Sequence, residues 1–380
     1  MASVEQSRDS ERPAKSTPPQ PPRVDPKLEP GLSRHTLAEP AQFEQQEPGR
    51  GRVAAWPHQI PWRGWRDIAW RTSREVNEDR LTVMAGSVTY HTLLAIFPAL
   101  GVFVSLYGLI ADVTAVEAQL VQMSAVFPPE AVRLIGEQML RLATGKPAGL
   151  SVAFAGSLLL SLWSASAGVR ALFDGLNIAY DETEKRGYLA RTAMTLGFTA
   201  ALLVFIGVIS GLLVAGPIML QAAGLSAGGL VAVRWPLVFL VATAAFSVAY
   251  RFGPSRERAR WRWLVPGGAA AAAVWMAGSV GFSWYLTNVA TLDLTYGSLG
   301  AVIGFMLWGW FSVMVVLIGA ELNAEIEHQT ALDSTTGAPE PMGERGAAMA
   351  DTVGLRFIGL RQGAEVIRGR VQALRSMLHR

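Results

Sequence analysis

The chain has 380 residues, of which 51% are hydrophobic and 17% charged, and its net charge is +3. A mean hydropathy of +0.28 argues against an ordinary soluble enzyme. The absence of cysteine excludes disulfide bonds, Cys-ligated zinc and thiol chemistry. Because the apolar residues fall in blocks of about 20, the length that crosses a hydrocarbon core, the sequence predicts an integral membrane protein.

Residues 1–55 are rich in Pro, Gln, Glu, Arg and Ser, and we expect them to form a disordered tail without a removable signal peptide. Residues 56–80 change character, because tryptophans alternate with arginines there. Tryptophan prefers the headgroup level of a bilayer and arginine meets anionic lipid. This pattern predicts an interfacial helix, with a soluble amphipathic stub as the alternative.

Residues 81–328 are predicted to form an all-α polytopic domain of six transmembrane helices. The first helix should tilt or kink, at Pro98, because its apolar run is longer than one perpendicular crossing. The predicted spans are Thr89–Ala111, Leu150–Val169, Ala193–Ala215, Leu230–Tyr250, Leu264–Leu286 and Leu299–Leu322.

Basic residues predict the orientation of these spans. They concentrate before the first span and in the loops after the second and fourth spans, whereas 217–229 and 287–298 contain no Lys or Arg. Both termini are therefore expected in the cytoplasm. We expect short amphipathic helices in the outer loop 112–149, a polar linker over 329–352, and a basic amphipathic helix over 353–380. That last helix suits an anionic membrane surface or a protein partner equally well.

Two GxxxG patterns predict helix-packing faces, because small residues let helices approach closely in a membrane. One is Gly207 with Gly211, and the other is Gly300 with Gly304. These faces permit a homo-oligomer without requiring one.

The sequence predicts no enzyme active site. No two histidines have the spacing of a metal pair on a helix, and no P-loop or GxSxG motif occurs. We therefore expect no metal, no cofactor, no catalytic residue and no nucleic-acid partner, with membrane lipids as the main contacts.

Three polar motifs stand within the apolar blocks. They are TYHTLLAIFP at 89–98, LWSASAGVR at 162–170 continuing to Asn177 and Tyr180, and TYGSLGA at 295–301 followed by GAELNAE at 319–325. In this order they resemble the signatures of the YihY/BrkB family over roughly residues 70–328, although His91 replaces a usual tyrosine. The resemblance implies a bacterial cytoplasmic-membrane protein with six spans. The family also carries an old ribonuclease label, but we see no acid–base set or metal cluster for RNA hydrolysis.

The candidate functional residues are the polar and aromatic residues of these motifs, Pro98, and residues at the outer end between the fifth and sixth spans. Those of the first two spans and of the outer end are interpreted either as a polar path between bundle and lipid or as interhelical hydrogen bonds with an aromatic belt. The residues are Tyr90, His91, Pro98, Trp163, Ser164, Ser166, Arg170, Asn177, Asn288, Tyr296, Glu321, Asn323 and Glu325.

Two hypotheses concern the charges at the inner ends of the second and sixth spans. Arg170 could pair along its own helix with Asp174, or across helices with Glu321, since a charge near hydrocarbon needs a partner or must reach water. The alternative is that each charge reaches water alone.

The leading functional hypothesis is that the chain handles or transports a lipid or amphipathic solute without its own ATPase. The alternative is a non-transporting envelope scaffold that recruits partners through its tails. A ribonuclease is the least favoured of the three.

Overall fold

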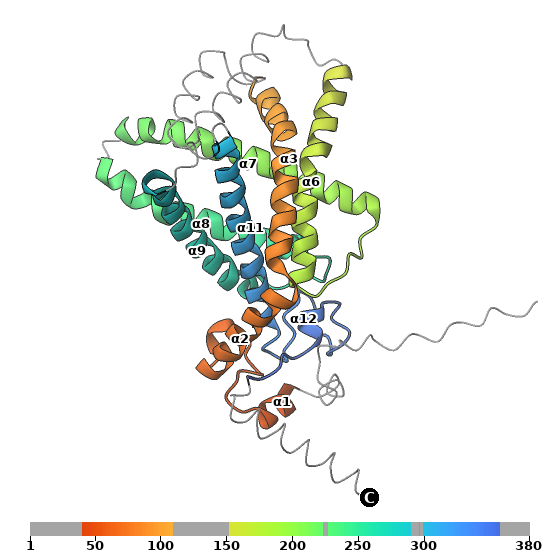
Figure 1. Ribbon diagram of the computed structural model, residues 1–380. Helices are drawn as coiled ribbons and strands as arrows, with labels where there is room; N and C mark the ends of the chain where they lie inside the picture. Colours follow the sequence, from red (N-terminus) through yellow and green to blue (C-terminus); the bar gives the residue numbers. More distant parts are fainter. Residues whose placement is uncertain (1–39, 109–151, 223–226, 290–295, 297–298, 358–380) are drawn as a thin grey trace, which may run out of the picture.

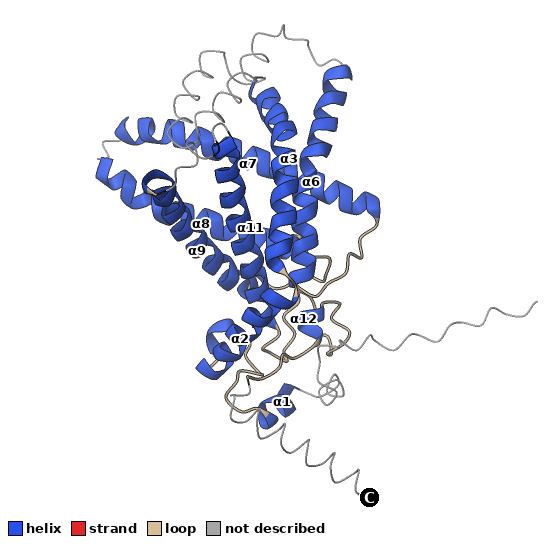
Figure 2. Ribbon diagram, viewed as in Figure 1, coloured by secondary structure: helices blue, strands red, loops and turns tan. Residues whose placement is uncertain are grey.

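The structure is a computed structural model that describes residues 40–108, 152–222, 227–289, 296 and 299–357 (Figure 1). Its regular elements in these ranges are helical, apart from an isolated β-bridge between Ala259 and Thr335 (Figure 2). The elements are α1 (Pro40–Gln46), η2 (Pro57–Gln59), α2 (Trp62–Glu78), α3 (Leu81–Gly108), α6 (Val152–Ala179), α7 (Tyr188–Ala222), α8 (Ala227–Phe252), α9 (Trp261–Asn288), α11 (Gly300–Glu327) and α12 (Ala348–Asp351).

The predicted all-α class is confirmed, and four helices in the described ranges are long and apolar enough to cross a membrane. Their apolar segments are Tyr188–Phe205, Trp235–Phe252, Trp261–Leu286 and Val302–Glu327. The chain is therefore a membrane protein with several spans. The first and second predicted spans correspond to α3 and α6, which are helices of 28 residues each but are not among these four.

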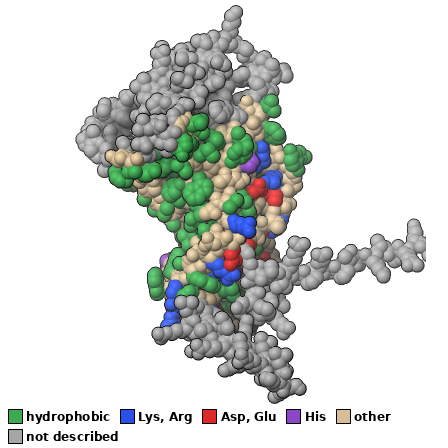
Figure 3. Space-filling view, in the orientation of Figure 1, with side chains coloured by type: hydrophobic (Ala, Val, Ile, Leu, Met, Phe, Trp, Pro, Cys, Tyr) green, Lys and Arg blue, Asp and Glu red, His purple; other side chains and the backbone are tan. Residues whose placement is uncertain are grey.

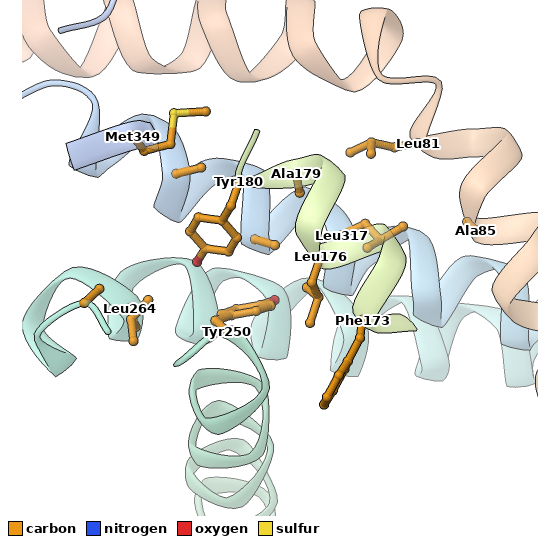
Figure 4. Close-up of a cluster of buried hydrophobic side chains, with 13 residues drawn as sticks. Leu81, Ala85, Phe173, Leu176, Ala179, Tyr180, Tyr250, Leu264, Leu317 and Met349 are labelled. Atoms are coloured by element: carbon orange, nitrogen blue, oxygen red, sulfur yellow. The ribbon is translucent and has the colours of Figure 1, made fainter. Parts of the chain in front are cut away.

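The helix α11 lies at the centre of the bundle, where it contacts α2, α3, α6 and α9. Further packing joins α3 with α6, α8 with α9, and α6 with α7 (Figure 1). The long helices converge near α12 and spread apart toward the opposite end. The main core lies at the convergent end, where the hydroxyl of Tyr250 donates to the Val316 carbonyl at 2.8 Å (Figure 4).

Glycines allow the closest helix contacts. A Cβ atom at Gly319 would lie 2.7 Å from the Cβ of Ala271, and one at Gly267 would collide with the Gly319 carbonyl and with Asn323. These glycines, which the GxxxG search did not single out, set the approach of α9 to α11. Gly300 and Gly304 are both buried in α11. The surroundings of Gly207 and Gly211 lie outside the described side chains.

The segments 40–60 and 328–357, which we call the terminal cap, pack together beside α2. Arg52 is 1% exposed and donates to the carbonyls of Gln329 at 3.1 Å and Gly354 at 2.7 Å. The amide of Ala331 donates to the Arg52 carbonyl at 2.8 Å. The ordered chain thus includes residues predicted as a disordered tail and as a polar linker, because buried arginines bind backbone carbonyls of both segments.

The terminal cap also helps to bury one face of α2, the predicted interfacial helix. Trp62 is 80% exposed, whereas Asp67, Ile68 and Arg71 are buried on the opposite face against α11 and the cap. The predicted outer-loop helices at 112–149, and most of the predicted helix 353–380, lie outside the described residues.

Candidate functional site: a lateral pocket and buried charges

Three helices line an open surface pocket of about 400 Å³. Positions 84, 87 and 91 of α3 share one helix face, as do positions 167, 170, 171 and 174 of α6, because residues three, four and seven apart lie in one row. The beginning of α7 closes the third side. The lining residues are Met84, Ser87, His91, Ala167, Arg170, Ala171, Asp174 and Arg191. The structure therefore brings His91 and Arg170, two of the predicted candidates, into one site.

Arg170 is held by groups of its own helix. Its guanidinium donates to the Ser166 hydroxyl and to the Trp163 carbonyl, the latter at 3.4 Å. It also lies over the Trp163 ring, 5.4 Å from the ring centroid. Within the described residues Arg170 forms no ion pair, and the groups that contact its guanidinium are a hydroxyl, a carbonyl and an aromatic ring.

Asp174 forms an ion pair with Arg191 of α7 at 2.6 Å, not with Arg170 as hypothesised. Arg191 also approaches Glu184 at 3.7 Å, and Glu184 accepts two bonds of 2.7 Å from Arg186. Hydrogen bonding to Arg186 lowers the pKa of Glu184 from 4.5 to about 2. Because Arg186 further donates to the Gly253 carbonyl at 2.8 Å, this network fixes the start of α7 to the end of α8.

His91 lines the pocket and uses one ring nitrogen within its own helix. Its Nδ1 lies 2.8 Å from the Ser87 carbonyl, and since a carbonyl can only accept, Nδ1 carries the hydrogen. The Nε2 atom is left as the second polar atom of the ring. Tyr90 stands edge-on to His91 at 5.6 Å but is 53% exposed and does not line the pocket.

Glu321 is completely buried, and neither of its carboxylate oxygens has a hydrogen-bond partner in the described part of the chain. The hypothesis of an Arg170–Glu321 pair is wrong. Arg170 faces the pocket between α3, α6 and α7, whereas the carboxylates that act electrostatically on Glu321 lie on α2 and α11 or just after α2 and α6. Those carboxylates are Glu325, Asp79, Glu75 and Asp181.

Glu325 is fully integrated into a polar network. It forms a buried ion pair with Arg71, whose Nη2 donates to the Gln329 side chain at 2.8 Å and whose Nη1 donates to the Leu355 carbonyl at 2.8 Å. Arg71 was not singled out from the sequence, because it is one of several arginines in the Trp/Arg-rich segment. Its burial on α2 depends on the position of α11.

Asn323 and Asn177 both make structural hydrogen bonds. Asn323 accepts from the Gly267 amide and donates to the Leu264 carbonyl, both at 2.8 Å, and so joins α11 to α9. Asn177 accepts from the Ser255 amide at 2.7 Å. Asn323 thus makes a hydrogen bond between two helices, and Asn177 joins α6 to the segment that follows α8.

Of the other candidates, Trp163 and Ser166 contact Arg170, and the rest of those that the structure describes do not line the pocket. Trp163 is 47% exposed and Tyr296 is 50% exposed, while Ser164 and Asn288 are also exposed. Ser166 is buried and donates to the Trp163 carbonyl at 2.6 Å. The side chain of Pro98 lies outside the described part. The sequence search did not select Ser87 and Arg191 of the pocket. Ser87 has helical spacing to His91, whereas Arg191 lies on α7 and joins the pocket only through the packing of that helix.

No metal centre is formed by the described residues, since no group of three or more His, Asp or Glu side chains comes together there. The polar groups that line the pocket are two guanidinium groups, a carboxylate, an imidazole and a hydroxyl. Figure 3 shows charged side chains and a histidine close together on one side of the helices, next to hydrophobic ones.

Comparison with known proteins agrees with this membrane architecture. The sequence profile of the family described as virulence factor BrkB matches residues 72–343. The chain is 28% identical over 259 residues to YfkH of Bacillus subtilis, described as ribonuclease-like, covering 65% of this chain and 90% of YfkH. It is 28% identical over 282 residues to a UPF0761 membrane protein of Alkalilimnicola ehrlichii, covering 72% and 62% of the two chains.

A third relative is the UPF0761 membrane protein of Rhodospirillum centenum, at 29% identity over 271 residues, or 68% of this chain and 56% of that protein. The chain thus spans less than two thirds of the length of the two UPF0761 proteins. No solved structure matches it.

Proposed function

We propose that this chain, which belongs to the virulence factor BrkB family and is similar to proteins described as membrane proteins, binds and moves an amphipathic molecule. The molecule is a lipid or a solute with a polar head and an apolar body. The site of action is the bacterial inner membrane, with six spans and both termini in the cytoplasm. The chain works without an ATPase or another catalytic step.

The observation that carries this proposal is the position of the polar pocket in an apolar setting. Arg170 lies nine residues before the end of α6, about 14 Å along the helix axis. Leu159, Leu160 and Trp163, which precede it on α6, are 66%, 66% and 47% exposed. A polar pocket that adjoins exposed apolar surface suits a molecule whose head leaves water while its body stays among hydrocarbon chains.

Helix length and charge support the proposed topology. The helices α3 and α6, with 28 residues each, are about 42 Å long, which exceeds a hydrocarbon core of about 30 Å. Lys185, Arg186 and Arg256 lie at the convergent end, beside the terminal cap. A cytoplasmic position for that end follows the preference of basic loops. The absence of cysteine makes single introduced cysteines a direct test of sidedness.

The test is lipid movement in sealed liposomes that contain the purified protein and a lipid labelled on its headgroup. A membrane-impermeant reductant bleaches only the outer leaflet, so bleaching beyond about half of the label reports movement. We expect such bleaching for the native chain and its loss in Arg170→Gln. Arg74→Gln is the matched control, because Arg74 lies outside the pocket in an exposed pair with Glu78.

Bleaching that stops at half with the native chain would refute unassisted lipid movement. The scaffold alternative predicts a different pattern, in which removal of residues 1–39 and 358–380 abolishes function in cells while Arg170→Gln does not. The ribonuclease alternative predicts RNA cleavage by the detergent-purified chain.

A further inference from the structure

We infer that the lateral pocket is a recognition site for the phosphate group of an amphipathic molecule, with Arg170 as the cation that binds it. This inference rests on the proposed function and names the chemical class of the head that the pocket accepts. It is drawn from the charge balance, the free donors and the size of the site.

The pocket carries one positive charge in excess. Its charged lining residues are Arg170, Arg191 and Asp174. The Asp174 carboxylate is engaged by Arg191 at 2.6 Å, and Arg191 also approaches Glu184 at 3.7 Å. Arg170 has no ion pair among the described residues, so a ligand group with one negative charge would balance it. A half-buried arginine without a counter-charge is costly in an apolar setting, which favours binding of an anion.

Arg170 also retains hydrogen-bond donors. A guanidinium has five N–H groups in a fixed fork that matches two oxygens of a phosphate. The described contacts of Arg170 use one bond to the Ser166 hydroxyl and one long bond of 3.4 Å to the Trp163 carbonyl. The Trp163 ring under the guanidinium restricts its position, which reduces the ordering cost when a ligand binds.

The opposite wall offers complementary polar atoms. The Nδ1 atom of His91 is used by the Ser87 carbonyl, so Nε2 remains to meet a phosphate oxygen or its hydrogen. Ser87 lines the same wall. A neutral imidazole can accept a hydrogen from a protonated phosphate, and a protonated imidazole can donate to an ionised one.

The size of the pocket selects a headgroup over a whole lipid. A volume of about 400 Å³ lies at the lower end for small-molecule sites. The acyl chains would remain outside, along the exposed apolar residues of α6. A soluble phosphate ester would use the same polar contacts, so the experiment has to separate the two sources.

The test measures equilibrium binding to the full chain in detergent with three probes. The first probe is a fluorescent phosphatidic acid, the second is a diacylglycerol with the same label and chains but no phosphate, and the third is inorganic phosphate as competitor. We expect phosphatidic acid to bind at least tenfold more tightly than diacylglycerol, which corresponds to one charge-assisted bidentate contact. Arg170→Gln should remove this preference, and Arg74→Gln should keep it.

Arg170→Lys serves as a second variant, because it retains the charge without the fork, and we expect an intermediate preference. If millimolar inorganic phosphate displaces the bound phosphatidic acid, the pocket recognises the phosphate alone. If inorganic phosphate does not displace it, the ligand is a phosphate-bearing lipid. Equal affinity for the two lipids, or a preference unchanged in Arg170→Gln, would overturn the phosphate site.

These outcomes are distinct from failure of the proposed function. If the native chain moves lipid in liposomes but shows no phosphate preference, only the assignment of the headgroup is wrong. If the native chain shows the preference without moving lipid, the pocket binds a phosphate ligand and the transport role is wrong.

Discussion

Arg71 of α2 and Glu325 of α11 form a buried ion pair across 254 positions of the sequence. Arg71 also donates to the carbonyl of Leu355 at 2.8 Å, so one side chain joins α2, the central helix α11 and the terminal cap. The carboxylate of Glu321 lies one helical turn away without a hydrogen-bond partner in the described residues. The two glutamates therefore have opposite roles in stability.

Glu325→Gln is expected to lower the free energy of unfolding by about 3 kcal/mol, because removal of one partner leaves the Arg71 charge buried without compensation. Glu321→Gln should not destabilise the protein, since a neutral amide removes a desolvated carboxylate beside other carboxylates. Denaturation of both variants by SDS in mixed micelles would measure the difference. Equal destabilisation of both would contradict this account of the pair.

Gly267→Ala is expected to destabilise the protein by about 1–3 kcal/mol, because the added Cβ collides with the Gly319 carbonyl and with Asn323. Gly281→Ala is the control on the same helix. In the part of the chain that the structure describes, no atom lies within 4 Å of a Cβ at Gly281, so this change should be neutral or slightly stabilising. Thermal unfolding of the two variants in detergent tests the contrast, and a destabilised Gly281→Ala would argue against the packing explanation.

The pair of Glu184 and Arg186 should stabilise the protein in a pH-dependent way. The pKa of Glu184 is lowered from 4.5 to about 2 by hydrogen bonding to Arg186. Its contribution is therefore complete above about pH 4.5 and is lost as the pH falls toward 2. The native chain should unfold at a higher temperature than Glu184→Gln at pH 6, and the gap should narrow at pH 3. A gap that is constant between these pH values would exclude ionisation of Glu184 as the cause.

Arg52→Gln is expected to loosen the terminal cap, because Arg52 binds the carbonyls of Gln329 and Gly354 and the carboxylate of Glu47. Limited proteolysis should then cleave within 40–60 and 328–357 faster than in the native chain, while the long helices stay protected. Arg74→Gln should show the native cleavage rate. Unchanged cleavage in Arg52→Gln would mean that other contacts hold the cap.

Much of the architecture was predictable from the sequence. The length of the apolar blocks predicted six long helices. The structure contains a long helix at each of these positions. Four of these helices are apolar enough in their described parts to cross a membrane. Family membership was also predictable, because three motifs occur in order over the region that the family profile matches. Both predictions depend on local pattern, which the sequence contains directly.

The candidate site was only partly predictable. Arg170 and His91 were selected as polar residues in apolar helices, but their common pocket depends on how α3, α6 and α7 rotate against one another. The same rotation separates Arg170 from Glu321 and places Asp174 against Arg191. Helical spacing within one helix cannot determine which face meets a distant helix.

The sequence by itself therefore determined the membrane class, the helix positions and the family, because hydrophobic length and motif order are properties of the chain. Only the tertiary structure decided which charges are paired, which glycines set the helix contacts and how the terminal cap is built. These depend on contacts between residues far apart in the sequence, such as Arg52 with Gly354 and Arg71 with Glu325. The energy of a buried charge is fixed by its neighbours in space, and those neighbours exist only once the helices have packed.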